Sequence, residues 1–532
     1  MSSWGKNRRP PIVRAPNRYV LTVRAYEGDP ARDSKIQGAA VVWDGLEPGE
    51  GVTDGSGNFT LPPLPPHGFN VTISGGQTDP PMRGTFGEHW RGVGLGRDQT
   101  VDFVLPFDPT PVPVIVPRRG LVGLDGHVFR DDDGRYLAVG TSLFWAGWGY
   151  LHDRQRLEDK NLAGLHAAGI DYIRVAGVLG GRGGDPTLVD SYHDRIVDPR
   201  DPRWTEMIAG LTDLAYDVYG LRVQWTLLMD DPAVPHDVVV GAFVAMSHGR
   251  EHKIQHWEVC NEGNGFHGNH AGMKALARRL RAETPNVVAV TAPSTFDAAP
   301  EYADSTANLL TWHTDRETFG GSEMWRPVRS ARAVLELPNW SGAWSSNEPI
   351  GPQSSGSHDV DPLRLTMAAV YTWICKGAAY VLHCGAGIRG GGAWEQRPDR
   401  IGLGIPPNLP ETSNFSAICA GLRMVRTILP RDLPNFTWAN SSIAAGGGHL
   451  FDVQEFQDGK VLRAMAGVAG DGRFVVAPIV APSPVTLRAK HAMRFELIDP
   501  MTGTVMSAHQ LFTGQIGRMP AAEATIIVGQ LT

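Results

Sequence analysis

The chain has 532 residues, of which 42% are hydrophobic and 20% are charged. It therefore exceeds one typical domain and can bury a large core, and we expect two or three folded units. Its 49 Lys and Arg residues against 56 Asp and Glu residues give a formal net charge of -7. The basic residues form no long run that could bind a phosphate backbone, so nucleic acid is excluded as an expected partner.

The cysteines and the apolar stretches limit the class of protein further. The four cysteines, Cys260, Cys375, Cys384 and Cys419, are too few and too widely spaced for a disulfide scaffold or a Cys-x-x-Cys metal site. The N-terminus lacks the apolar region of a secretory signal, and no later stretch reaches the length of a membrane span. We expect a soluble chain with no membrane partner. The sequence leaves the oligomeric state and the compartment open, an extracellular or virion-associated location included.

Residues 18–107 predict a small β-sandwich, because short apolar runs are separated by Gly, Pro and Asp turns and helical periodicity is absent. Residues 38–42 and 52–61 resemble the carboxypeptidase-regulatory-like (transthyretin-like) β-sandwich family. Asp54–Asn58 within this stretch also fits a plain hairpin turn. A calcium site there is disfavoured, since the loop lacks the closing acidic residue of an EF-hand.

A Pro-rich segment, residues 108–119, predicts an extended linker. From residue 120 to 430, short apolar runs alternate with amphipathic helices, which predicts a (β/α)₈ TIM barrel. An open doubly wound sheet is the rival, but no Gly-x-Gly-x-x-Gly follows the first strand. Residues 434–532 return to alternating runs and predict a C-terminal β-sandwich. The predicted barrel strands are Tyr136–Ser142, Tyr172–Ala176, Arg222–Leu228, Gln255–Cys260, Val287–Ala292, Leu309–His313, Gly342–Asn347 and Ala379–Cys384.

Two of the predicted strand ends carry a glutamate preceded by asparagine. Glu262 follows the fourth strand and Glu348 follows the seventh. Catalytic groups of a TIM barrel sit at the C-terminal ends of its strands. Glycoside hydrolysis needs two carboxylates flanking the scissile bond, and this pair meets that demand.

The segment Trp257-Glu-Val-Cys-Asn-Glu262 resembles the Trp-Glu-Ile-Trp-Asn-Glu motif of glycoside hydrolase clan A, and the similarity spans the predicted barrel. The resemblance implies that Glu262 is the general acid/base and Glu348 the nucleophile. It further implies that Arg174 hydrogen-bonds the nucleophile, that Asn261 binds the sugar 2-hydroxyl and that His313 lies near the nucleophile. The chemistry of this clan needs no metal and no organic cofactor.

Some positions depart from the pattern or leave a choice open. Gly263 stands where many relatives have Pro, and Glu336 is a rival nucleophile if the seventh strand lies earlier. His267 and His270 lack the Glu and the spacing of a helical zinc motif, so we predict no metal site. Tryptophans on or after strand ends predict rings that stack on sugars. They are Trp145, Trp148, Trp312, Trp344 and Trp394.

The sequence thus predicts a retaining glycoside hydrolase that acts on a poly- or oligosaccharide, with a β-type or otherwise equatorial linkage implied by the resemblance. The alternative is a non-catalytic carbohydrate-binding or adhesion protein, for example a phage virion component. A barrel kept only for binding has no chemical reason to retain Glu262, Glu348 and Arg174 together. The sugar and the choice between endo and exo action stay open.

Overall fold

The structure is a computed structural model. It describes residues 20–26, 36, 39–43, 48–64, 68–74, 85–86, 89–94, 97–104, 107–108, 116–179, 196–229, 232, 234–263, 269–293, 299–316, 324–337, 340–352, 359–386, 408–439, 450–455, 466–479, 485–520 and 522–532. The chain divides into two compact units, Met1–Val114 and Ile115–Thr532. Trp394 and His267 lie outside the described residues.

The first unit contains two β-sheets that share one core. Leu21 and Val23 of one sheet and Val41 and Val71 of the other are fully buried in the same cluster, as expected for sheets packed face to face. Asp54 Oδ1 accepts hydrogen bonds from the backbone N–H groups of Ser56 and Asn58, the arrangement of a turn. The strand orders are β4 (Asn58–Thr60), β1 (Leu21–Tyr26), β8 (Gln99–Val104), and β3 (Gly49–Val52), β2 (Ala40–Trp43), β5 (Gly68–Ser74), β7 (His89–Gly94); β6 (Thr85–Phe86) pairs with β9 (Phe107–Asp108).

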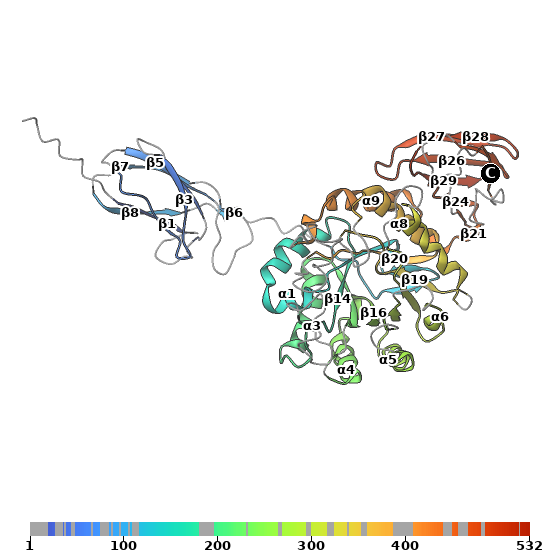
Figure 1. Cartoon of the computed structure of the whole chain (residues 1–532), viewed down its shortest axis with the longest axis horizontal. Coiled ribbons are helices and arrows are strands. Elements are labelled where there is room, and N and C mark those ends of the chain that lie inside the picture. The colour runs from blue at the N-terminus through green and yellow to red at the C-terminus, as the bar shows by residue number, and fades with distance from the viewer. Residues whose placement is uncertain are drawn as a thin grey trace, which may run out of the picture. The chain divides into compact units, whose positions relative to one another are not determined.

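The second unit is centred on an eight-stranded parallel sheet (Figure 1). Two backbone hydrogen bonds, from Asn308 to Val288 (3.1 Å) and from His313 to Pro293 (3.3 Å), join the outermost strands and close the sheet into a barrel. The predicted (β/α)₈ barrel is confirmed, and each predicted run overlaps one strand of the barrel sheet. In sheet order the strands are β17 (Val288–Ala292), β16 (Ile254–Asn261), β15 (Arg222–Leu228), β14 (Tyr172–Ala176), β13 (Ala138–Ser142), β20 (Gly377–Leu382), β19 (Ala343–Ser346) and β18 (Leu309–Trp312).

Helical segments surround the strands on the outside (Figure 1). Because both faces of each strand are covered, every residue of all eight strands is buried. Two of the helical segments contain a π-helical stretch, η1 next to α2 and η3 directly after α3. The helical segments are α1 (Ala146–His152), η1 (Arg156–Leu162), α2 (Ala163–Leu165), α3 (Trp204–Asp213), η3 (Leu214–Val218), α4 (His236–Ser247), η4 (Glu251–Lys253), α5 (His270–Glu283), α6 (Ala299–Tyr302), α7 (Arg326–Arg329), η7 (Ser330–Glu336), α8 (Pro362–Ile374), η8 (Leu409–Glu411), α9 (Phe415–Ile428) and η9 (Leu433–Asn435).

A small antiparallel sheet, β10 (Gly123–Asp125), β11 (Val128–Asp131) and β12 (Gly134–Tyr136), covers the N-terminal end of the barrel. Its Phe129 is buried in one cluster with Tyr172 and Ala343, the first residues of β14 and β19. Among the described residues, this end of the barrel is therefore filled by side chains.

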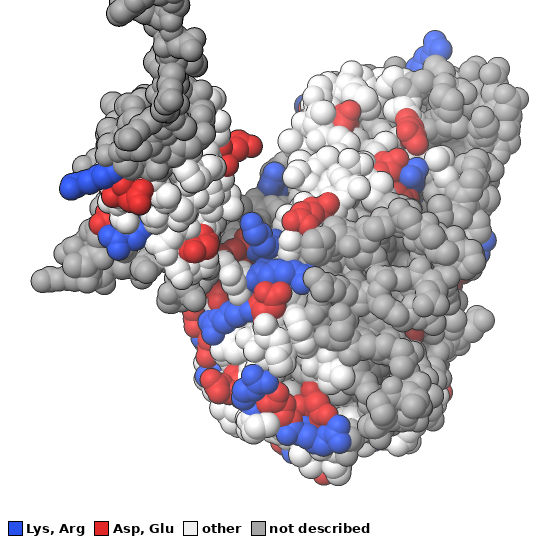
Figure 2. All heavy atoms as spheres, turned by 60° about the vertical axis from the view of Figure 1, so that its left-hand side comes forward, with Lys and Arg blue, Asp and Glu red and all other residues white. Residues whose placement is uncertain are grey.

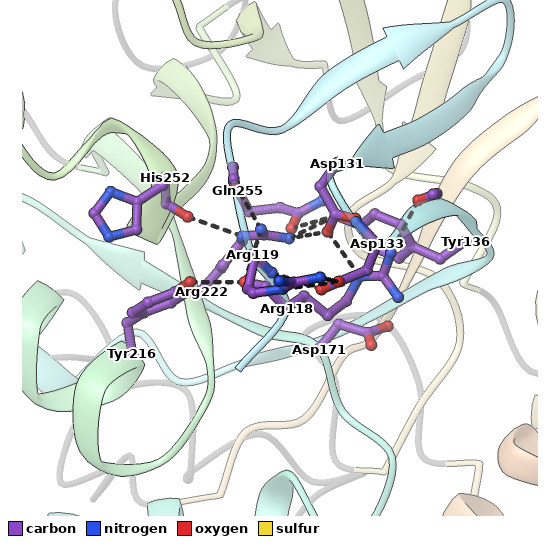
Figure 3. A network of polar contacts seen from close by, with 12 residues as sticks. Arg118, Arg119, Asp131, Asp133, Tyr136, Asp171, Tyr216, Arg222, His252 and Gln255 are labelled. Atoms are coloured by element: carbon purple, nitrogen blue, oxygen red, sulfur yellow. Dashed lines mark hydrogen bonds and ion pairs between the residues drawn. The ribbon is translucent and has the colours of Figure 1, made fainter. Parts of the chain in front are cut away.

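Ion pairs hold the small sheet to the barrel (Figure 3). Asp131 accepts hydrogen bonds from Arg118 Nη2 (2.6 Å) and from Arg222 Nη1 (2.7 Å). Arg222, on β15, also donates to the backbone oxygens of Arg118 and Gly120. The Asp131 side chain has no exposed surface, and that of Arg222 is 2% exposed.

We expect Asp131→Asn to lower the free energy of unfolding by about 3–5 kcal/mol, because it leaves the buried guanidinium of Arg222 without its counter-charge. Thermal or urea unfolding measures this. The matched control is Asp133→Asn, whose partner Arg119 is 70% exposed, with an expected loss under about 1 kcal/mol. Equal losses for the two variants would contradict a buried ionic clamp.

Two further sheets form the C-terminal sandwich. Phe451 of one sheet contacts Phe474 and Phe495 of the other in a shared core. Tyr371 of α8 donates a 2.5 Å hydrogen bond to the Ala477 backbone oxygen, so the sandwich packs on the barrel. The strand orders are β21 (Thr437–Ala439), β23 (Ala466–Val468), β24 (Arg473–Val476), β29 (Ile526–Leu531), β26 (Met493–Ile498), β27 (Val505–Leu511), and β22 (Phe451–Glu455), β25 (Val485–Ala489), β28 (Ile516–Met519).

Among the described residues, none of the helices has the length and apolar character needed to cross a bilayer. On the face drawn in Figure 2, acidic and basic side chains are interspersed over the described surface.

Candidate active site

Charged side chains converge where the barrel strands end. Glu262 and His313 directly follow β16 and β18, Glu348 lies two residues beyond β19, and His383 follows β20. Arg174, on β14, reaches the same group. The predicted Asn-Glu pair thus lies at the C-terminal end of the barrel, the end that carries active sites in this fold.

Glu348 is enclosed by cationic and imidazole groups. Arg174 Nη1 donates to Glu348 Oε1 (2.7 Å), and His313 Nε2 lies 3.3 Å from the same oxygen. Arg316 Nη1 donates to Oε2, and His383 Nε2 lies 3.6 Å from it. The Glu348 side chain is 6% exposed. Both of its oxygens are therefore held in place.

Burial of Glu348 opposes its ionisation, but His313, His383, Arg316 and Arg174 outweigh burial and hold its pKa well below the ordinary value. Burial lowers the pKa of His383 to about 3. The site therefore favours the ionised form of this carboxylate.

This environment predicts a low acid limit for any reaction that needs the Glu348 carboxylate in its ionised form. A carboxyl group whose pKa is lower in the folded than in the unfolded protein stabilises the folded state at pH values above the unfolded-state pKa. That stabilisation is lost as the pH falls through the folded-state pKa. We expect kcat/KM for an aryl glycoside with a good leaving group to be maintained below about pH 4.3, the ordinary glutamate pKa. A pH profile measures this, and an acid limb at or above that pH, with the protein still folded, would contradict it.

Arg174 links the nucleophile candidate to a second, deeper glutamate. Its Nη2 donates to Glu258 Oε1 (2.6 Å) and to Asn261 Oδ1 (2.9 Å). Burial opposes its charge, but Glu258 and Glu348 more than compensate and raise its pKa. Arg174 and Glu258 have no exposed side-chain surface. The predicted contact between Arg174 and Glu348 is present, and Asn261 is fixed beside it.

Glu258 was not among the predicted site residues. Thr226 Oγ1 donates to its Oε1 (2.8 Å), and Asn347 Nδ2 donates to its Oε2. A signal for it exists in the sequence, because Glu258 is a carboxylate in the middle of an eight-residue strand that is buried throughout. Glu258 therefore fixes the side chains of Arg174 and Asn347 through hydrogen bonds. Its own carboxylate is buried and out of reach of a ligand.

The backbone at Glu262 is in the left-handed region, with φ of 42°. This conformation is uncommon for a residue with a side chain, and such strain clusters at functional sites. The next residue is confined as well, because a Cβ on Gly263 would lie 2.7 Å from Cys260 Sγ and 3.2 Å from Thr291 Oγ1. The departure from the clan pattern at Gly263 thus has a steric cause, since a proline ring has no room there.

His313 bridges the two catalytic candidates. Its Nδ1 lies 3.1 Å from Glu262 Oε1, and its Nε2 faces Glu348. One ligand atom from each of Glu262, His313 and Glu348 lies within 4.8 Å of the others. These three groups are close enough to one another to bind a metal ion. However, Arg316 and Arg174 already supply positive charge to Glu348.

Arg316 also went unpredicted. It comes three residues after His313, in a loop, and its Nη2 lies 3.6 Å from Glu262 Oε1 while its Nη1 contacts Glu348. Its side chain is 14% exposed. No strand pattern marks such a position, so the sequence offered no signal for it.

The predicted aromatic platform needs correction. Trp344 has no exposed surface, and its Nε1 donates to the Cys375 backbone oxygen. Trp145 is also fully buried, and its Nε1 donates to the Ala386 backbone oxygen. Neither ring has a face open to a ligand, so the prediction is wrong for both; Trp312 is buried likewise. Trp148 is partly buried beside His152.

The rival nucleophile Glu336 lies away from this group. It ends η7, its side chain is 66% exposed, and it pairs with Arg332 one turn earlier. Glu348 is therefore the glutamate that follows β19 and faces Glu262.

No protein-family model matches the sequence, and no curated protein matches it. A solved structure described as a glycoside hydrolase has a TM-score of 0.51 at 13% identity, over 78% of this chain and 97% of that chain. A family 5 glycoside hydrolase from Bacteroides vulgatus ATCC 8482 has a TM-score of 0.49 at 12% identity, over 77% and 93%. A putative glycoside hydrolase from the same organism has 0.48 at 13%, over 97% and 99%. The first likeness shows a shared fold, so this chain has a barrel architecture that a glycoside hydrolase also uses.

Proposed function

We propose that the protein is a retaining glycoside hydrolase in which Glu348 is the nucleophile and Glu262 the general acid/base. The observation that carries the proposal is the facing pair itself: two glutamates from different strand ends, with an oxygen of each within 4.8 Å of the other. Retaining glycosidases hold their carboxyl groups about 5–5.5 Å apart, and inverting ones about 6.5–9.5 Å. The approach of one oxygen from each carboxylate to within 4.8 Å favours the closer of these two arrangements, and so supports double displacement.

Differences between the two environments support the assignment of roles. Glu348 is 6% exposed and hydrogen-bonded by two guanidinium groups, which favours a permanently ionised nucleophile. Glu262 is 20% exposed, and its nearest described ionisable partner is the His313 ring. A group that must lose and regain a proton in each cycle needs this access to water.

In the first step, Glu348 attacks the anomeric carbon as Glu262 gives its proton to the departing glycosidic oxygen. A covalent glycosyl-enzyme forms on Glu348. Glu262 then removes a proton from water, and that water releases the sugar with its original anomeric configuration. Arg174 and His313 orient the nucleophile throughout, and Asn261 is a candidate donor to the sugar 2-hydroxyl. By the resemblance to clan A, the cleaved bond is β-type or otherwise equatorial.

Reducing-sugar release from a panel of polysaccharides tests the proposed activity, with Glu348→Gln as the matched inactive control. The anomer that appears first, followed by proton NMR, should keep the configuration of the substrate. First appearance of the opposite anomer would exclude double displacement. Binding to a polysaccharide without any release of sugar would favour the non-catalytic carbohydrate-binding alternative.

A further inference from the structure

Ser142 lies between two of the groups that enclose the proposed nucleophile. It ends β13 and pairs in register with Arg174 of β14. On the other side of β13, Thr141 pairs with Leu382, which ends β20. The next residues, Ser142 and His383, are therefore level with each other. Side chains that are level on neighbouring parallel strands point to the same face of the sheet, so Ser142, Arg174 and His383 all point into the barrel.

A hydrogen bond joins Ser142 to the imidazole ring of His383. Ser142 Oγ lies 2.9 Å from His383 Nδ1. The other ring nitrogen, Nε2, lies 3.6 Å from Glu348 Oε2. The Phe144 ring packs beside the imidazole, with the ring centroids 5.9 Å apart. Because Ser142 is only 1% exposed, its hydroxyl group is shielded from a ligand and acts on the reaction through the imidazole ring.

The hydroxyl group of Ser142 suits one arrangement of hydrogens on the ring. When the imidazole is neutral, the hydroxyl donates to a bare Nδ1, and the ring hydrogen is on Nε2. When the imidazole is charged, the hydroxyl accepts from Nδ1–H, and Nε2 again carries a hydrogen. The remaining tautomer would direct the Nε2 lone pair at Glu348, whose ionised form the site favours. In both charge states, Nε2–H therefore faces Glu348 Oε2.

We propose that Ser142 is a positioning residue for the second chemical step: its hydroxyl group holds the His383 ring so that Nε2–H stabilises the Glu348 carboxylate as it leaves the sugar. The inference rests on the proposed glycosidase function and adds a residue to its machinery.

The two chemical steps place opposite demands on this hydrogen bond. In the second step, water attacks the anomeric carbon and gives its proton to Glu262. The bond from that carbon to the Glu348 oxygen breaks, and its electron pair stays on the carboxylate. A donor aimed at the carboxylate stabilises this developing charge. In the first step the charge on Glu348 is consumed, so the same donor gives no such help.

A 2-deoxy-2-fluoro glycoside of the preferred sugar measures the two steps separately. The rate of inactivation reports formation of the glycosyl-enzyme, and the rate of reactivation after removal of the reagent reports its hydrolysis. In Ser142→Ala we expect reactivation to be slower by about 10-fold, the scale of one buried hydrogen bond, while inactivation stays within about 3-fold of the wild type. A general disturbance of the structure would slow both rates.

Two controls separate the hydroxyl group from the loss of a buried atom. Ser142→Thr keeps the hydroxyl group, and both of its rates should stay within about 3-fold of the wild type. Ser247→Ala removes a buried hydroxyl group of α4 that donates to the Val244 backbone oxygen, and it should change neither rate. Thermal unfolding checks that each variant is folded.

A double variant tests whether Ser142 acts through His383. His383→Phe keeps a ring but removes both nitrogens, and it should slow reactivation as Ser142→Ala does. Adding Ser142→Ala to His383→Phe should change reactivation by less than about 2-fold, because residues that act as one unit are not additive. In ¹⁵N NMR of histidine-labelled protein, with His383→Phe to assign the signal, we expect hydrogen on Nε2 and a hydrogen-bonded Nδ1 that Ser142→Ala releases.

Equal slowing of both rates in Ser142→Ala, unchanged reactivation, or additive losses in the double variant would overturn the inference. The glycosidase proposal would stand in each case, because the wild type is still labelled and reactivated. If the wild type cleaves no glycoside and takes no label, the glycosidase proposal fails and the NMR signal of His383 decides. An Nδ1 signal that changes in Ser142→Ala would support the orientation of the ring by Ser142. Hydrogen on Nδ1 alone, or an Nδ1 signal that Ser142→Ala leaves unchanged, would overturn it.

Discussion

Glu348→Ala is expected to abolish hydrolysis of every glycoside, with kcat lowered by about 10⁵–10⁶-fold, the scale seen when a nucleophile is removed. No other described carboxylate can take its place, because Glu258 lies beneath Arg174 without exposed surface and Glu336 lies on the barrel exterior. Steady-state rates on a natural substrate and on an aryl glycoside measure this. Glu336→Ala is the matched control, and its kcat should be similar to that of the wild type. Substantial activity in Glu348→Ala would contradict the assignment of Glu348 as the nucleophile.

Glu262→Ala should separate the two chemical steps. On natural glycosides we expect a loss of about 10²–10⁴-fold, because the leaving oxygen departs without a proton. On an aryl glycoside with a good leaving group, formation of the glycosyl-enzyme should be spared and its breakdown should become rate-limiting. A burst of released phenol followed by a slow steady state would show this. Equal loss on both substrate types would contradict a role as general acid.

With added azide, the two variants should form glycosyl azides of opposite anomeric configuration. In Glu262→Ala, azide attacks the glycosyl-enzyme without needing a general base, so a β-substrate should give the β-glycosyl azide. In Glu348→Ala, azide replaces the nucleophile and should give the inverted product. The opposite outcome in the two variants would reverse the roles of Glu262 and Glu348.

The barrel was predictable from the sequence because its strands are buried on both faces. Short, largely apolar runs such as Val287–Ala292, separated by amphipathic helices, specify parallel β-strands with few alternatives. Arg174, Glu262, His313 and Glu348 could be placed together because the strand ends of a closed barrel meet at one face. Placing these four residues together requires only the boundaries of the strands.

The aromatic side chains were misjudged because position at a strand end does not fix the direction of a side chain. Successive residues of a strand point to opposite sides. His313 faces the site, so its predecessor Trp312 faces outward, where it packs on Trp344 with ring centroids 5.9 Å apart. This alternation was present in the sequence and would have assigned Trp312 to the side opposite His313. It would not have assigned Trp344, because Glu348 lies four residues after it and beyond the end of β19.

Arg316 and the strained backbone of Glu262 could not be predicted in this way. Arg316 lies in a loop, where no periodicity reports the direction of a side chain. The positive φ of Glu262 and the close approach of Gly263 to Cys260 and Thr291 belong to the folded barrel, and no local sequence pattern reports them. Such features arise from tertiary packing.

The most direct test of the account is to trap the covalent intermediate. A 2-deoxy-2-fluoro glycoside with a good leaving group, chosen from the sugar that the panel identifies, should inactivate the enzyme and add the mass of one fluorosugar. The fluorine slows both formation and hydrolysis of the glycosyl-enzyme, and the good leaving group restores the rate of formation alone, so the intermediate accumulates. Proteolysis and tandem mass spectrometry should place the sugar on Glu348, with no label in Glu348→Gln. Label on Glu262 or Glu336, or rapid turnover of active enzyme without any covalent adduct, would contradict double displacement through Glu348.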